Sequence, residues 1–166
     1  MNKEELITKK IDSLKCKGQY GTDIKDSINK MFLHFNKLKH KLLNGNYKVK
    51  NHLYSLIHSS VNTAVLKQYK CLGYEDIKNK YEELEKLLIK KNADYGNSFD
   101  KTLDEFGINT GLVRIADKIN RIANLKDKDE DHIQAEEKLE ETILDIAGYS
   151  VLFSIYLENN HKEAEK

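Results

Sequence analysis

Residues 133–158 form the segment that most constrains how this chain can fold. Acidic residues recur in its first half at Glu137, Glu141 and Asp145, four positions apart, so they span only about 80° of a helix surface. Continued at the same angle the stripe becomes small and apolar, and residues 146–157 are apolar nearly all round. A helix that is apolar on every side is buried. The segment therefore predicts a central helix with its last two acids at the edge of a buried groove.

The rest of the chain also favours helices. Its 166 residues include no proline and 8 glycines, and 33% are charged, a composition that leaves helices uninterrupted. Apolar residues recur at helical spacing in residues 24–42, 53–69, 77–88 and 112–123. We therefore predict an all-α fold, a helical bundle of about five to six helices.

Charge divides the chain into two halves. Residues 1–92 hold 19 lysines against 10 acids, and residues 93–166 hold 9 lysines and arginines against 17 acids. We expect residues 1–72 to form an N-terminal helical extension that serves oligomerisation, residues 74–158 to form the bundle that carries the chemistry, and residues 159–166 to form a flexible tail. Opposite charges on the two halves suit a contact between subunits, which predicts a homo-oligomer.

Several classes of protein are not expected. No apolar run approaches the ~20 residues needed to cross a bilayer, and the first residues lack the apolar core of a signal peptide. Cys16 and Cys71 stand alone, which is typical of a reducing cytoplasm. Nucleic-acid binding is also not expected, because lysine and asparagine are common throughout the chain and indicate coding bias more than a basic binding surface.

Arginine occurs only twice, at Arg114 and Arg121, against 26 lysines. The planar guanidinium grips carboxylate or phosphate oxygens with two parallel hydrogen bonds, which lysine does not do. Lys118 lies between the arginines on the same helical face, beside Asp117. Clustered carboxylates in a groove require a positive partner. These cationic side chains could supply it in a closed ion-pair network, or a hard divalent cation could.

The stretch Lys90–Phe99 differs from the helical segments around it. It is polar and turn-forming, and it places Tyr95 and Gly96 among potential hydrogen-bonding groups. We expect a loop at a helix end. Such a loop could hold a phosphate or an aromatic ring, or it could be a plain turn between two helices.

Three motifs in this order resemble the phage-associated nucleotide modification associated domain 1 family. They are Lys91-x-x-Asp94-Tyr95-Gly96-x-Ser98, Arg114-x-x-Asp117-Lys118-x-x-Arg121 and Glu137-x-x-x-Glu141-Thr-x-x-Asp145-x-x-x-Tyr149. The resemblance covers roughly residues 78–157. That family is similar to the all-α nucleotide pyrophosphatases of the MazG and dimeric dUTPase type, in which acidic motifs on two helices bind Mg²⁺ and the phosphates of the substrate.

The resemblance implies Mg²⁺-dependent hydrolysis of a nucleoside polyphosphate by a homo-oligomer, in the host cytoplasm if the protein belongs to a phage. The implied metal ligands are Asp117, Glu137, Glu141 and Asp145. The implied catalytic residues are Asp117, Lys118, Glu141 and Asp145. The implied substrate-binding residues are Lys91, Asp94, Tyr95, Ser98, Arg114, Lys118 and Arg121, with Tyr95 available to stack on the base.

The sequence departs from the pyrophosphatase pattern at two points. Arg114 stands where an acid is usual, and Glu141 and Asp145 are four residues apart where three is usual. Two alternatives therefore stay open. One is non-catalytic binding or sequestration of a nucleotide or of a nucleotide-derived host-defence signal; the other is a helical interaction protein without a ligand.

Overall fold

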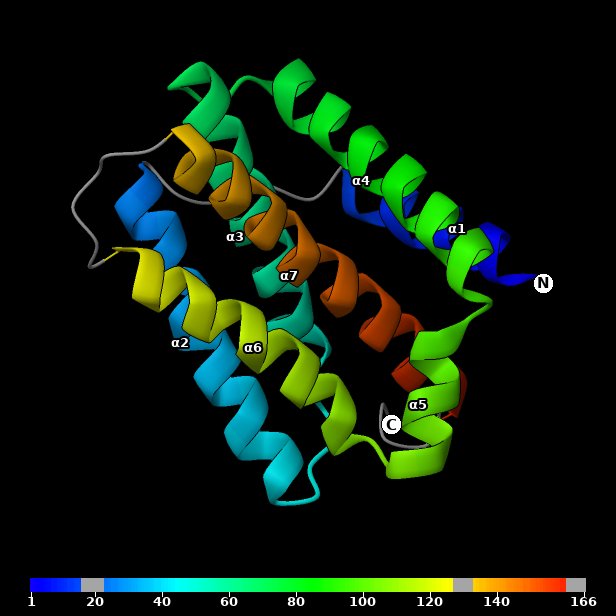
Figure 1. The fold of residues 1–166 in the computed structure, drawn as a ribbon. Helices are drawn as coiled ribbons and strands as arrows, with labels where there is room; N and C mark the ends of the chain where they lie inside the picture. The colour runs from blue at the N-terminus through cyan, green and yellow to red at the C-terminus, as the bar shows by residue number, and fades with distance from the viewer. Residues whose placement is uncertain (16–22, 127–132, 161–166) are drawn as a thin grey trace.

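The computed structural model describes residues 1–15, 23–126 and 133–160, with side chains described up to residue 124 and again from residue 139. Within these ranges the chain forms seven α-helices and no strand (Figure 1). The helices are α1 (Lys3–Lys15), α2 (Ile24–Leu43), α3 (Lys50–Tyr69), α4 (Tyr74–Tyr95), α5 (Ser98–Phe106), α6 (Asn109–Lys126) and α7 (Ile133–Asn160). The predicted all-α bundle is confirmed. The flexible tail predicted for residues 159–166 lies almost entirely outside the described residues.

The last helix, α7, lies at the centre of the bundle, as its apolar second half predicts. It packs against α1, α3, α4, α5 and α6 (Figure 1). One hydrophobic core lies between α7, α3, α2 and α6, and it includes Phe35, Ile115 and Phe153. A second core lies between α7, α3, α1 and α4, and it includes Tyr81 and Val151. The helices α3 and α7 therefore form a layer that the two cores share.

The helices before residue 73 pack into the same two cores as the helices after it. Twelve of the 20 residues of α3 are buried, on every side of the helix, and α1 packs on α4 and α7. The salt bridges Lys3–Asp100 (2.6 Å) and Lys10–Glu158 (2.5 Å) fix α1 to α5 and α7. Residues 1–72 are thus packed onto the helices that follow them, although charge alone marks them off as an extension.

The start of α2 follows a capping residue. Asp23 caps α2, because its carboxylate accepts the backbone N–H of Asp26 at 2.7 Å. The loop expected over Lys90–Phe99 is wrong in its extent, because α4 continues to Tyr95 and α5 begins at Ser98. No residue in that stretch breaks a helix before Gly96, where the backbone becomes left-handed. The connection is therefore a turn of only two residues.

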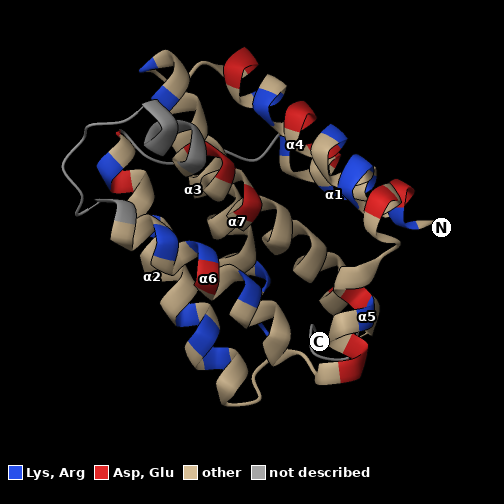
Figure 2. Ribbon diagram, in the orientation of Figure 1, with Lys and Arg blue, Asp and Glu red and all other residues tan. Residues whose placement is uncertain are grey.

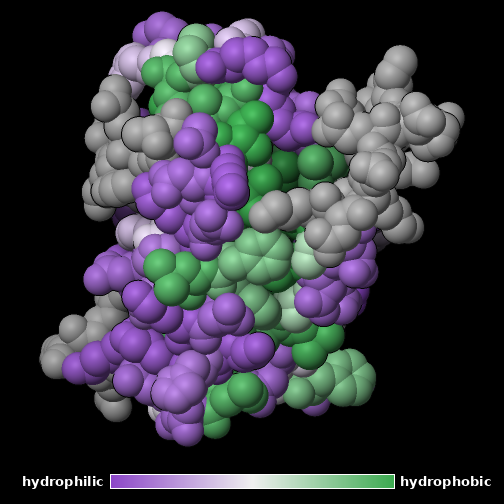
Figure 3. All heavy atoms as spheres, turned by 90° about the vertical axis from the view of Figure 1, so that its left-hand side faces the viewer, coloured by the Kyte–Doolittle hydropathy of each residue, from purple (hydrophilic) through white to green (hydrophobic). Residues whose placement is uncertain are grey.

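Charged positions recur along the helices of the bundle (Figure 2). On the side that lies at the left of Figure 1, most of the surface is hydrophilic, with hydrophobic side chains visible between the polar ones (Figure 3). Across the described ranges, every helix is too short or too polar to cross a membrane.

Candidate functional site

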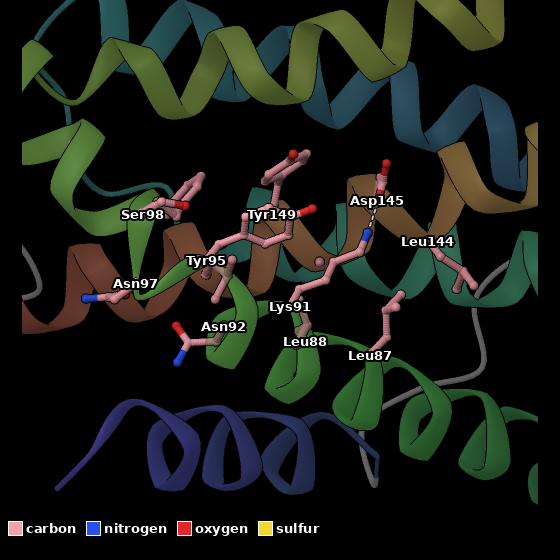
Figure 4. Close-up of a pocket in the computed structure, with 13 residues that line it drawn as sticks. Leu87, Leu88, Lys91, Asn92, Tyr95, Asn97, Ser98, Leu144, Asp145 and Tyr149 are labelled. Carbon is pink, nitrogen blue, oxygen red and sulfur yellow. Dashed lines mark hydrogen bonds and ion pairs between the residues drawn. The ribbon is translucent and has the colours of Figure 1, made fainter.

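A pocket of about 220 Å³ lies where the end of α4 and the start of α5 meet α7 (Figure 4). Its lining combines leucine side chains, aromatic rings, small polar groups and one pair of opposite charges. The lining residues are Leu87, Leu88, Lys91, Asn92, Tyr95, Asn97, Ser98, Phe99, Leu144, Asp145, Gly148, Tyr149 and Leu152. The α7 members continue the acidic stripe into its apolar part, as the spacing predicts.

Glycine and asparagine shape this pocket locally. Gly96 (φ 56°) and Asn97 (φ 57°) both adopt left-handed backbone, and this two-residue turn brings α5 back beside the end of α4. On α7, a Cβ placed on Gly148 would lie 3.0 Å from Leu88 Cδ2. The missing side chain therefore lets α4 and α7 approach closely at the pocket wall.

Asp145 forms the electrostatic centre of the pocket. Its two carboxylate oxygens bind Lys91 Nζ at 2.9 Å and Lys118 Nζ at 2.8 Å, and its side chain is only 13% exposed. Burial raises the pKa of Asp145, but the hydrogen bonds and charges of Lys118 and Lys91 outweigh it and hold that pKa below its usual value. Asp145 is thus an ionised carboxylate that joins α4, α6 and α7.

Lys91 reaches Asp145 along the pocket (Figure 4). Burial lowers the pKa of Lys91, but the hydrogen bond and charge of Asp145, with smaller contributions from Tyr149 and Glu141, raise it above its ordinary value. This ammonium group therefore stays charged while its side chain remains 42% exposed.

On α6, Lys118 belongs to a cationic stripe with Arg114 and Arg121, one turn away on either side. Both arginines are exposed. Neither forms an ion pair with a residue whose side chain the structure describes. Figure 2 shows basic positions along both α6 and the neighbouring α2.

The register of α6 on α7 places this stripe relative to the pocket. The two helices run in opposite directions (Figure 1). Gly111 lies against Phe153, since a Cβ on Gly111 would lie 2.9 Å from the Phe153 ring, and Lys118 binds Asp145. Counting between these two contacts puts Arg114 at the level of Tyr149, which lines the pocket.

Aromatic rings form the other end of the pocket. Phe99 stacks on Tyr149, with ring centroids 5.9 Å apart and ring planes 26° apart. Phe99 also meets Phe153 edge-on at 6.3 Å. Tyr95 is 68% exposed at the pocket lining. Such a set of rings offers a flat apolar surface to a planar ligand.

The predicted carboxylates are not gathered together. Asp117 and Glu141 are exposed, and Glu141 lines a shallower neighbouring hollow with Lys91. The side chain of Glu137 lies outside the described residues. Among the side chains that are described, no three His, Cys, Asp or Glu residues are placed to hold one metal ion. Because Asp145 binds two lysines, the described carboxylates do not fit Mg²⁺ unless those lysines move away from Asp145.

The predicted substrate-binding residues divide between the pocket and the surface. Lys91, Tyr95 and Ser98 line the pocket, whereas Asp94 is exposed and does not. Sequence reasoning did not include Asn97 and Phe99 as site residues. Phe99 comes three residues after Gly96, a signal that could have indicated it; nothing in the sequence singled out Asn97.

Comparison with protein-family models matches residues 91–157 to the family described as nucleotide modification associated domain 1. No curated protein and no solved structure matched the chain. The matched range begins at Lys91 and contains both Asp145 and the α6 stripe. The family resemblance of the three motifs is therefore supported over the part of the chain that builds the pocket.

Proposed function

We propose that the pocket binds a nucleotide or a nucleotide-derived small molecule, with the base at the aromatic end and the phosphates at the cationic end. The observation that carries this proposal is Asp145 held between Lys91 and Lys118 beside a cavity lined by aromatic rings. A ligand that is flat and apolar at one end and anionic at the other matches both ends.

The size of the cavity limits how much of the ligand it encloses. Its volume of about 220 Å³ is below the roughly 300–1,000 Å³ typical of clefts that bury a drug-sized ligand. The pocket therefore holds one ring system with part of the sugar. The phosphates then lie outside it, toward α6.

The cationic end suits phosphate groups. An ammonium group has three N–H donors, so Lys91 and Lys118 keep donors for a ligand while they bind Asp145. Arg114, at the level of Tyr149, adds a planar pair of donors that matches phosphate oxygens. The family description, nucleotide modification associated domain 1, also favours a ligand of this class.

Isothermal titration calorimetry with a panel of nucleotides and cyclic dinucleotides, with and without Mg²⁺, tests this proposal. We expect a mononucleotide to bind, and Lys118→Gln to weaken it about tenfold or more, the effect of losing one charge-assisted hydrogen bond of about 1.5–3 kcal/mol. Lys101→Gln is the matched control, because Lys101 is exposed on α5 and lies outside the pocket lining. If no nucleotide binds, or both variants bind as the wild type does, the pocket has another role.

Mg²⁺-dependent hydrolysis of the bound nucleotide is the second candidate function. It is favoured by Glu141 and Asp145, which lie one turn apart on α7 beside Lys91. Product analysis with a saturating nucleoside triphosphate separates the two functions. Release of pyrophosphate or phosphate with Mg²⁺, lost in Glu141→Gln, would establish turnover, whereas binding without products would leave a binding protein.

We also propose that the protein is a homo-oligomer. Packing restricts the surface that the predicted extension, residues 1–72, can offer to another subunit, because α3 is largely buried within the subunit. The available surface is the outer side of α2, where Leu33 is 49% and Leu43 is 62% exposed. Light scattering at micromolar concentration tests this, and a monomer would contradict it.

A further inference from the structure

Two carboxylates of the described chain each lie between two lysines. The pocket triad is Lys91–Asp145–Lys118, with distances of 2.9 and 2.8 Å. The anchor triad is Lys10–Glu158–Lys50, with distances of 2.5 and 3.6 Å. Both have two cations and one anion, so each carries a net charge of +1, but the two are buried in opposite ways.

In the anchor triad the cation is the buried group. Lys10 is 8% exposed, while Glu158 is 30% exposed and also accepts a hydrogen bond from Tyr54 Oη at 3.3 Å. The neighbouring hollow has only about 20 Å³. This carboxylate covers a buried ammonium group, and the space beside it is too small for a ligand.

In the pocket triad the anion is the buried group. Asp145 is 13% exposed, whereas Lys118 is 24% and Lys91 is 42% exposed. The carboxylate holds both ammonium groups: Lys91 lines the cavity with Asp145, and Lys118 reaches the same carboxylate from α6 and stays partly exposed. The pocket triad therefore leaves both ammonium groups partly exposed, whereas the anchor triad buries the ammonium group of Lys10.

We propose that Asp145 is a positioning residue that takes the place of the ligand's phosphate in the empty pocket. It keeps Lys91 and Lys118 in place until an anionic ligand binds them, so the ligand enters as a free anion and not as its Mg²⁺ complex. This inference rests on the proposed function, since it concerns the same cationic end of the pocket. Lys91 and Lys118 supply positive charge to a carboxylate that belongs to no cluster of three metal-ligating side chains among the described residues.

Charge balance gives the consequence. With Asp145 present, a phosphate dianion changes the net charge of the triad from +1 to −1. With asparagine in its place, the same dianion would take the triad from +2 to zero. Replacing Asp145 therefore destabilises the protein without a ligand, because the two lysines lose their counter-charge. It also strengthens the interaction of the two lysines with anions, because buried charges are most stable when they are compensated.

Thermal unfolding of Asp145→Asn with inorganic pyrophosphate in EDTA tests the inference, with Glu158→Gln as the matched control. We expect both variants to melt below the wild type without the anion. Pyrophosphate should then raise the Tm of Asp145→Asn by about 2–4 °C more than that of the wild type. Glu158→Gln should respond as the wild type does. Equal shifts in the two variants, or a shift that needs Mg²⁺, would overturn the inference.

Lys91→Met keeps the test decisive if Asp145→Asn does not fold, because Lys91 is the most exposed member of the pocket triad. It should remove most of the pyrophosphate-induced shift seen in the wild type, and an unchanged shift would overturn the inference.

The outcomes also separate this inference from the proposed function. If the wild type binds nucleotide but Asp145→Asn gains no anion response, only the role of Asp145 fails. If Asp145→Asn gains that response but no nucleotide binds, the pocket accepts another anion.

Discussion

The pocket triad and the anchor triad contain the same kinds of group at similar distances, yet their surroundings give them different roles. Glu158 lies over a buried lysine and ties α1 and α3 to α7. Asp145 lies under two accessible lysines at the edge of a cavity. The comparison teaches that ion-pair composition does not distinguish the structural contact from the proposed binding site. The two triads differ in which member is buried.

The largest expected effect is on stability in the anchor triad. Glu158→Gln leaves Lys10 as a buried cation without a carboxylate partner. Removing one member of a buried pair typically costs about 3–5 kcal/mol, and we expect about 2–3 kcal/mol because Glu158 is 30% exposed and surface pairs contribute less. Urea unfolding measures this loss. If the variant is as stable as the wild type, the Lys10–Glu158 pair does not contribute to holding α1.

A smaller loss is expected in the pocket triad. Asp145→Asn leaves two lysines close together, but both can turn toward water, since Lys91 is 42% and Lys118 is 24% exposed. We therefore expect a loss of about 1–2 kcal/mol, near that of one hydrogen bond to a charged group. The same urea experiment gives the order of the two variants. A larger loss for Asp145→Asn than for Glu158→Gln would reverse the comparison.

The smallest effect concerns pH. The lysines hold the pKa of Asp145 below its usual value, so its contribution to stability is complete above the unfolded-state pKa of about 3.9. That contribution is lost as the pH falls through the lower pKa of the folded state. The Tm difference between the wild type and Asp145→Asn should therefore be constant at neutral pH and shrink below about pH 4. A difference that persists in strong acid would show that the charge of Asp145 is not its cause.

Local rules were enough to predict most of the fold. The helical spacing of apolar residues in 24–42 predicts α2, and the apolar second half of α7 predicts its central position. The acidic stripe also placed Asp145 correctly at a groove edge. The end of α4 was misjudged because Lys90 to Tyr95 are polar residues that can form either a helix or a loop, and their packing against α7 is not a local property.

The sequence does not predict which side chains from other helices contact the site residues. Spacing groups Asp145 with Glu141, and the family resemblance adds Asp117. Spacing along a helix does not say which lysine reaches across from another helix. Lys91 and Lys118 come from α4 and α6 and meet at one carboxylate only because all three helices pack together. The aromatic end depends likewise on the turn at Gly96, which brings Phe99 onto Tyr149.

The most direct test of the pocket triad is the pKa of Asp145 itself, followed by carbon-13 NMR of its carboxyl group and assigned with Asp145→Asn. In the protein without ligand, the pKa should lie below that of an ordinary aspartate, because both lysines bind the carboxylate. With saturating pyrophosphate in EDTA it should rise, because the anion takes over Lys91 and Lys118 and adds negative charge beside them. A low pKa that pyrophosphate leaves unchanged would contradict a ligand-exchanging triad and would make Asp145 a structural carboxylate like Glu158.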